Sequence, residues 1–116
     1  MNKFKNRVIT ILFLSSFIIA QPIIDLIEPA FGRIGSTVRI SGNNFSSNSI
    51  ESTVFLSGLE ANILNSTENE IIISVPYGAY YTPISVYTNG LYASSSQRFN
   101  VIFDAEEELT VEHLAN

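Results

Sequence analysis

The chain has 116 residues, enough for one domain, and carries six basic against eleven acidic residues, a formal net charge of −5. An acidic chain without clustered Lys and Arg argues against binding to the phosphate backbone of nucleic acids. The sequence contains no cysteine, which excludes disulfide staples, thiolate catalysis and attachment through a lipid-modified cysteine.

The first 20 residues have the layout of a secretory signal peptide. Lys3, Lys5 and Arg7 precede an apolar run over residues 8–20, and cleavage is predicted between Ala20 and Gln21. The alternative is a membrane anchor, but a spanning helix needs about 20 apolar residues. We therefore expect an exported chain with no stable membrane anchor after cleavage. Loss of the three basic residues leaves three Arg against eleven acidic residues, a net charge of −8.

From residue 23 onward, short segments alternate apolar and polar side chains between clusters of turn-forming residues, a pattern typical of a β-sandwich. We expect strands over residues 23–27, 37–41, 53–57, 61–64, 70–75 and 83–88, and a last one in which Phe99, Val101 and Phe103 alternate. Turns or loops are expected at 31–35, 46–49, 65–69 and 77–81. The side chains expected to face the core are Val38, Ile40, Phe45, Val54, Leu56, Ile84 and Val86.

Asn89-Gly90 is the strongest local signal, because this dipeptide between alternating segments favours a two-residue type I′ hairpin. The turn would set Thr88 opposite Leu91, Tyr87 opposite Tyr92, and Val86 opposite Ala93. Val86 and Ala93 would then face the core, and the two tyrosines would sit side by side on the opposite face.

After Phe103 the alternation stops, and residues 104–116 are rich in acidic side chains. An acidic run at a terminus usually forms a solvated tail or a single weak helical turn. We therefore expect a signal peptide at 1–20, one domain at 24–103 and an acidic C-terminal tail at 104–116.

The segment that opens the domain, residues 24–45, resembles the start of an IPT/TIG domain, and the resemblance extends to Phe103. The shared positions are Pro29, Gly32, Gly35, Thr37, Gly42, Phe45, Gly58, Val75-Pro76, Pro83, Val86 and Asn89-Gly90. Two departures are mild: Ser36 stands where a second glycine is usual, and Ile84 replaces valine. The resemblance implies an all-β, immunoglobulin-like (E-set) sandwich of about seven strands, in which these residues serve structure rather than catalysis.

The residues offer little for catalysis, metal binding or cofactors. His113 is the only histidine and falls in the acidic tail, so no serine has an evident partner base. Zinc would need several His or Cys ligands, and the glycines at 32 and 35 do not lead into a helix as a phosphate loop requires. Solvation explains the remaining carboxylates better than glycoside hydrolysis or calcium binding does: Glu51, Glu60, Glu68, Glu70 and Glu106–Glu108. We therefore predict no catalytic residue, metal or cofactor.

The tyrosines are the candidate ligand-binding residues. Tyr80 and Tyr81 lie with Tyr77 on one expected loop, and Tyr87 and Tyr92 form the expected outward pair. Exposed aromatic rings can stack on sugars or anchor a protein partner. The alternative is that the cross-strand pair only stabilises the hairpin, by about 0.2–1 kcal/mol.

These observations predict an exported, non-enzymatic module for protein interaction or adhesion at the cell surface or in the periplasm. The alternative is a carbohydrate-binding accessory module for polysaccharide recognition, because the family resembled here includes domains attached to polysaccharide-acting proteins. The expected partner is thus a protein or a polysaccharide, and not a nucleic acid. Family members usually carry this module beside others, so the chain is expected to be a subunit or a fragment of a larger assembly.

Overall fold

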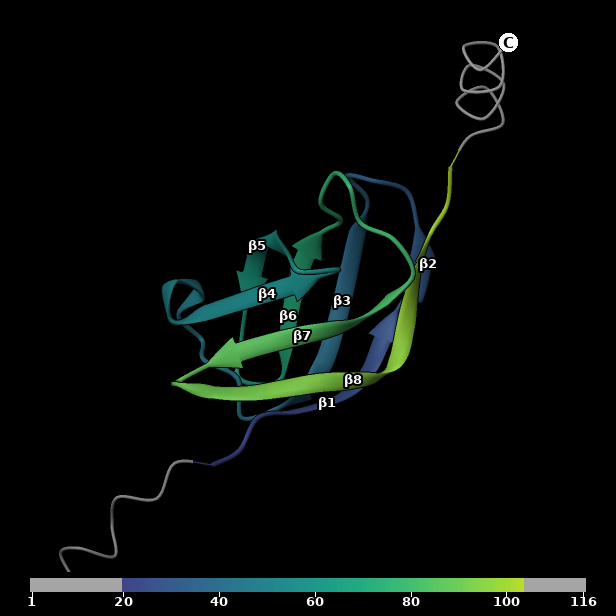
Figure 1. Cartoon of the computed structure of the whole chain (residues 1–116). Coiled ribbons are helices and arrows are strands. Elements are labelled where there is room, and N and C mark those ends of the chain that lie inside the picture. Colours follow the sequence, from purple (N-terminus) through teal and green to yellow (C-terminus); the bar gives the residue numbers. More distant parts are fainter. Residues whose placement is uncertain (1–19, 104–116) are drawn as a thin grey trace, which may run out of the picture.

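The computed structural model of the chain describes residues 20–103, and the regular structure of this part is almost entirely β-strand (Figure 1). A single 3₁₀ turn, η1 (Ser49–Glu51), interrupts them. The strands are β1 (Ile23–Glu28), β2 (Phe31–Gly32), β3 (Thr37–Asn43), β4 (Ser52–Leu56), β5 (Leu59–Ser66), β6 (Glu70–Ser74), β7 (Thr82–Thr88) and β8 (Leu91–Val101).

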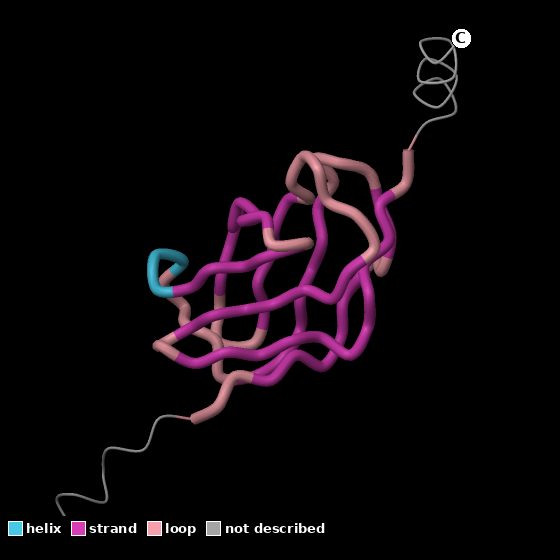
Figure 2. The backbone as a smooth tube through the Cα atoms, in the orientation of Figure 1, coloured by secondary structure: helices cyan, strands magenta, loops and turns pink. Residues whose placement is uncertain are grey.

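The strands form two layers, whose order across the hydrogen-bonded sheet is β1-β3-β6-β5-β4-β7-β8-β2 (Figures 1 and 2). β5 joins the layers, because Leu59 to Ala61 pairs with β4 and Asn62 to Ser66 pairs with β6. One layer therefore holds β1, β3 and β6, and the other holds β4, β7 and β8. This is the immunoglobulin-like sandwich that the sequence predicts.

The inward side of each strand supplies the core, as the alternation predicts. Of the eight side chains expected to face inward, seven are buried and Ala93 is half-buried; Phe45, which follows β3, is only 3% exposed. Both layers contribute fully buried residues, which lock the sheets face to face. They are Val38, Ile40, Ile71 and Ile73 from one layer and Val54, Leu56, Ile84, Val86 and Phe99 from the other.

The hairpin between β7 and β8 has the predicted register. Tyr87 is paired with Tyr92, and Val86 with Ala93. Asn89 and Gly90 both have positive φ, 52° and 76°, which a type I′ turn requires. Val86 is fully buried and Ala93 half-buried, so the two tyrosines lie on the outer face.

The end of β5 corrects the sequence interpretation. The loop expected at 65–69 begins later, because β5 continues to Ser66. A shift of register between Ile63 and Asn65 lets the strand bulge and still pair with β6, where Ser66 lies opposite Ile71. The polar residues there suggested a loop, but backbone pairing to a neighbour decides whether a polar segment forms a strand.

The two ends of the β2–β8 pairing also differ from expectation. Phe31 and Gly32, expected in a turn, form the short strand β2, which pairs in parallel with β8 and makes eight strands rather than about seven. Phe103, expected in the last strand together with Phe99 and Val101, lies beyond β8 and is half exposed. Its strand ends because β2 is two residues long and offers no further partner: the last backbone bond runs from the Ile102 N–H to the Gly32 carbonyl.

A small buried polar cluster ties the hairpin to the loop before η1. The Thr88 side chain is 1% exposed, and its Oγ1 accepts the Ser46 N–H at 3.1 Å and the Ser52 hydroxyl at 2.9 Å. The Ser66 hydroxyl in turn donates to the Ser46 carbonyl. Across residues 20–103, no buried side-chain polar atom lacks a hydrogen-bond partner, and this includes the side chains of the cluster.

Thr88→Val should lower the free energy of unfolding by about 2 kcal/mol, although valine has nearly the same shape. Valine accepts no hydrogen bond, so the Ser46 N–H and the Ser52 hydroxyl would stay buried without partners. Urea unfolding measures the loss, and Thr88→Ser, which keeps the acceptor, should lose less. Equal stability of the valine variant and the parent would show that this cluster contributes nothing.

Candidate functional site: an aromatic row on the outer sheet face

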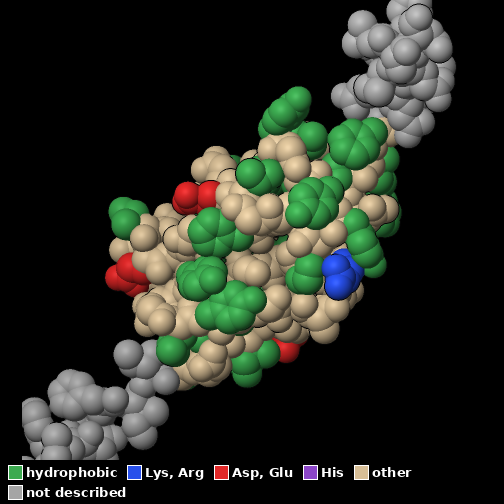
Figure 3. Space-filling view, in the orientation of Figure 1, with side chains coloured by type: hydrophobic (Ala, Val, Ile, Leu, Met, Phe, Trp, Pro, Cys, Tyr) green, Lys and Arg blue, Asp and Glu red, His purple; other side chains and the backbone are tan. Residues whose placement is uncertain are grey.

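Three aromatic side chains form a row across the outer face of β4, β7 and β8. Phe55 and Tyr87 meet edge to face with ring centroids 5.7 Å apart, and Tyr87 and Tyr92 lie 5.0 Å apart with planes tilted by 50°. Phe55 and Tyr87 alternate with buried neighbours on their strands, and Tyr92 with half-buried ones, so the three rings face outward. Figure 3 shows hydrophobic side chains gathered over these strands. We call Phe55, Tyr87 and Tyr92 the aromatic row.

The row borders an open depression of about 440 Å³. Besides the aromatic row, six residues line it, all of them uncharged: Ser57, Gly58, Thr82, Pro83, Ser85 and Ser94. Hydroxyl groups both donate and accept hydrogen bonds, and aromatic faces offer apolar stacking area. A second depression of about 460 Å³, beside η1, includes Glu60 and Ile50 but no aromatic side chain.

Two neighbouring serines lower the pKa of the Tyr92 hydroxyl group. Ser85 and Ser94 are paired across β7 and β8, next to the tyrosine pair on the same face. Hydrogen bonds from the Ser85 side chain, and then from Ser94, lower the pKa of the Tyr92 phenol below its ordinary value of 10.0. The two serines stabilise the ionised oxygen and so make the phenol more acidic. A more acidic O–H group is a stronger hydrogen-bond donor.

Ser85→Ala should raise the pKa of Tyr92 toward the ordinary value, as followed by the ultraviolet absorbance of the phenolate. The folded pKa lies below the unfolded one, so the stability contributed by this group is present above pH 10 and lost as pH falls through the folded pKa. The alanine variant should therefore gain less stability than the parent as pH rises through this window. Ser96→Ala is the control, and an unchanged titration in Ser85→Ala would refute the assignment.

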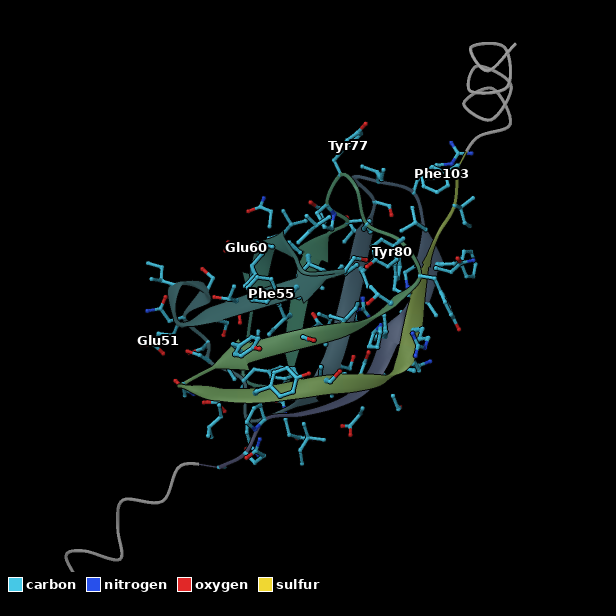
Figure 4. The ribbon with its side chains drawn as sticks, viewed as in Figure 1. Glu51, Phe55, Glu60, Tyr77, Tyr80 and Phe103 are labelled. Carbon is cyan, nitrogen blue, oxygen red and sulfur yellow. The ribbon has the colours of Figure 1, made fainter. Side chains whose placement is uncertain are left out.

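The other two predicted ligand-binding tyrosines are not part of the row. Tyr80 and Tyr81 lie on the loop between β6 and β7, are 63% and 59% exposed, and do not line the depression. Figure 4 shows Tyr80 and Tyr77 on this loop, away from Phe55. The Ser57 hydroxyl fixes the loop by donating to the Tyr80 carbonyl and accepting its N–H.

Tyr81 has a separate partner, since the Arg98 guanidinium lies 5.4 Å from its ring centroid in a cation–π contact. A bulge in β8 separates this pair from the aromatic row. Ser95 is buried there, accepts the Ile84 N–H and donates to the Gln97 carbonyl, and the register shifts between Pro83 and Ser85. The structure therefore brings together two of the four predicted tyrosines and sets the other two apart.

Phe55, Ser85 and Ser94 were missed by the sequence reasoning. Each alternates with inward-facing residues, which signals an outward side chain, but alternation does not say which strands are neighbours. Phe55 joins the row because β4 pairs with β7, with Phe55 opposite Ser85. That pairing is non-local and has no local sequence signal.

Two of the carboxylates considered for catalysis have partners of their own in the structure. Glu51 accepts a hydrogen bond from the Ser46 hydroxyl, and Glu70 pairs with Arg39 at 3.3 Å on the outer face of the other layer. Within residues 20–103, no three His, Cys, Asp or Glu side chains gather where they could hold a metal ion. His113 and Glu106–Glu108 lie outside the described residues.

The predicted cleavage site lies at the edge of the described part. Ala20 is exposed, and the Gln21 side chain donates to the Tyr92 carbonyl at 2.8 Å, which ties the start of the domain to β8. Residues 1–19 lie outside the described range. Among the residues described, none forms a helix long and apolar enough to cross a membrane.

Two antiparallel layers joined by β5, with a packed core between them, define an immunoglobulin-like β-sandwich module. The sequence profile of the IPT/TIG domain matches residues 22–101, which is more than half of the chain. The chain therefore belongs to the IPT/TIG domain family. No curated protein sequence matches it.

Solved structures share the fold at low sequence identity. An auxiliary nutrient binding protein from Bacteroides thetaiotaomicron superposes with a TM-score of 0.69 at 18% identity, over 72% of this chain and 21% of that one. A protein solved with a xylogluco-oligosaccharide gives 0.60 at 18% identity, over 74% and 20%. The plexin A4 extracellular region gives 0.61 at 21% identity, over 71% and 10%. The chain thus spans about a fifth, or less, of the length of these proteins.

Proposed function

We propose that this protein is an exported, non-enzymatic binding module that recognises a glycan through its aromatic row. The observation that carries the proposal is that three neighbouring aromatic rings and three serine hydroxyls surround one uncharged depression. Aromatic rings stack on the apolar faces of sugars, and hydroxyls exchange hydrogen bonds with them. The nutrient-binding protein and the protein solved with a xylogluco-oligosaccharide share the fold, which is consistent with this role.

The test is retention of the purified chain on a panel of polysaccharides, by affinity electrophoresis and pull-down. Tyr87→Ala and Tyr92→Ala should each weaken retention by at least about tenfold, because each removes one stacking surface. Tyr77→Ala is the matched control: this ring is 88% exposed and lies outside the depression. Circular dichroism checks that the fold persists. Retention unaffected by either substitution would refute the proposal.

The export that we propose fits the same function, because polysaccharides and surface partners lie outside the cytoplasm. The proposal of export rests on the basic start and the apolar run of residues 1–20. N-terminal sequencing of the protein recovered from the periplasm, surface or medium of the host should begin at Gln21. Recovery of a chain that begins at Met1 from the cytoplasmic fraction would contradict export.

A second candidate function, a protein-interaction or adhesion module, is favoured by the loop between β6 and β7. Tyr77 and Tyr80 expose most of their rings there, and Ser57 fixes the loop backbone. Exposed tyrosines on a held loop suit a protein interface. In cross-linking within the native host, Tyr77→Ala and Tyr80→Ala should remove a partner that Tyr87→Ala leaves in place; the reverse pattern would reject this candidate.

A further inference from the structure

The rings of the aromatic row do not form a flat platform. The planes of Phe55 and Tyr87 are nearly perpendicular, at 88°, and those of Tyr87 and Tyr92 differ by 50°. A crystalline polysaccharide presents a plane of parallel chains, and stacking on such a plane needs rings that are coplanar. Rings that turn from one to the next instead suit a single chain whose sugar faces also turn along its length.

The row runs diagonally across the strands. Tyr87 and Tyr92 are directly paired, whereas Phe55 lies opposite Ser85, two residues from Tyr87. Three neighbouring strands at a spacing of about 4.8 Å make the row roughly 10 Å wide, which suits a short stretch of chain. The depression continues beside the row toward Thr82 and Pro83, which leaves room for that chain to pass along it.

The charges around the row oppose an anionic ligand. None of the residues that line the depression is charged, and Glu60 lies opposite Phe55 on the neighbouring strand β5. Figure 4 places the Glu60 side chain close to Phe55. Arg98, the cation on β8, is held over the Tyr81 ring instead. A carboxylated or sulfated chain would thus approach a carboxylate and meet no cation among the lining residues, at a cost in electrostatic energy.

We propose that the ligand is a single, uncharged, soluble glycan chain that lies along the aromatic row, across β4, β7 and β8. This inference rests on the proposed function and narrows its substrate class. Tyr87 and Tyr92 stack on successive sugars, and the hydroxyls of Ser85, Ser94 and Tyr92 exchange hydrogen bonds with the sugar hydroxyls. Because the interaction involves no ionic contact, its strength does not depend on salt.

The test compares three classes of probe with the purified full chain. Native gels contain either neutral soluble chains (xyloglucan, galactomannan, soluble starch) or anionic ones (alginate, polygalacturonate), and pull-downs use crystalline cellulose and chitin. We expect retardation by at least one neutral soluble chain, nearly unchanged at high salt, and no retention on the anionic or crystalline probes. Binding should strengthen with oligosaccharide length over the first few sugars and then level off.

Variants connect the result to the row. Tyr87→Ala and Tyr92→Ala should each weaken binding of the neutral chain by at least about tenfold, whereas Tyr77→Ala and Glu60→Gln should leave it nearly unchanged. Phe55→Ala should weaken it for the longer oligosaccharides more than for the shortest. Tyr92→Phe keeps the ring and loses the hydroxyl, so it separates stacking from hydrogen bonding if an alanine variant fails to fold.

The outcomes separate the two claims. Retention on crystalline or anionic probes that depends on Tyr87 and Tyr92 would overturn this inference and leave the glycan function standing. Retention on no glycan, or retention that these tyrosines do not affect, would overturn both.

Discussion

Gly42→Ala is expected to lose about 3 kcal/mol or more of its free energy of unfolding. Gly42 is buried in β3 and lies opposite Ile24 of β1. A methyl group at this position would overlap the carbonyl oxygen of Ile23 and press on the Phe45 ring. Backbone cannot yield as a flexible side chain does, so β1 would have to move away from β3. Urea unfolding measures the loss.

Gly35→Ala is the matched control for this prediction. Gly35 has a φ of 84°, and a methyl group there would meet nothing within 4 Å. Its cost comes only from the left-handed backbone and should be about 1 kcal/mol. If the two alanine variants lose the same stability, close backbone approach is not the reason for the glycine at position 42.

Phe99→Ala is expected to lower the free energy of unfolding by about 3–5 kcal/mol, the range for removing a fully buried aromatic ring. Phe99 is 0% exposed and lies on β8, opposite Thr82 of β7. It is the largest of the fully buried side chains in the described range, so its removal leaves a large cavity beneath the sheet that carries the aromatic row. Thermal or urea unfolding measures the change.

Phe103→Ala provides the comparison. The Phe103 ring is half exposed and follows the last strand, so its removal should change stability by no more than about 0.5 kcal/mol. A loss in Phe103→Ala comparable with that in Phe99→Ala would mean that the ring packs against something outside residues 20–103.

The inner and outer sides of the β4–β7–β8 sheet have separate roles, one in stability and the other in the proposed binding. The inner sides of β4, β7 and β8 hold the sandwich together through Val54, Val86 and Phe99. The outer side of the same strands carries the aromatic row, in which Tyr87 and Tyr92 are about half exposed and Phe55 is partly buried. Substitutions in the row should therefore change binding with little effect on folding, which makes the proposed function testable without unfolding the protein.

Local signals in the sequence were sufficient to predict most of the strands and the hairpin. Val38 and Ile40 predicted an inward face by alternation, and Asn89-Gly90 predicted a turn whose register placed Tyr87 beside Tyr92. These features depend on residues close together in the chain, where side-chain period and turn chemistry act directly. The same reasoning failed at Asn65 and Phe103, where the presence or absence of a distant partner strand decides the conformation.

The sequence by itself therefore determined an all-β sandwich, its core residues, its family resemblance and one aromatic pair. Only the tertiary structure decided that Phe55 joins that pair, that Ser85 and Ser94 line the same depression, and that Tyr80 and Tyr81 lie elsewhere. The physical reason is that sheet order and β-bulges come from non-local backbone pairing. Such pairing brings together side chains more than 30 positions apart, and alternation along a single strand carries no record of it.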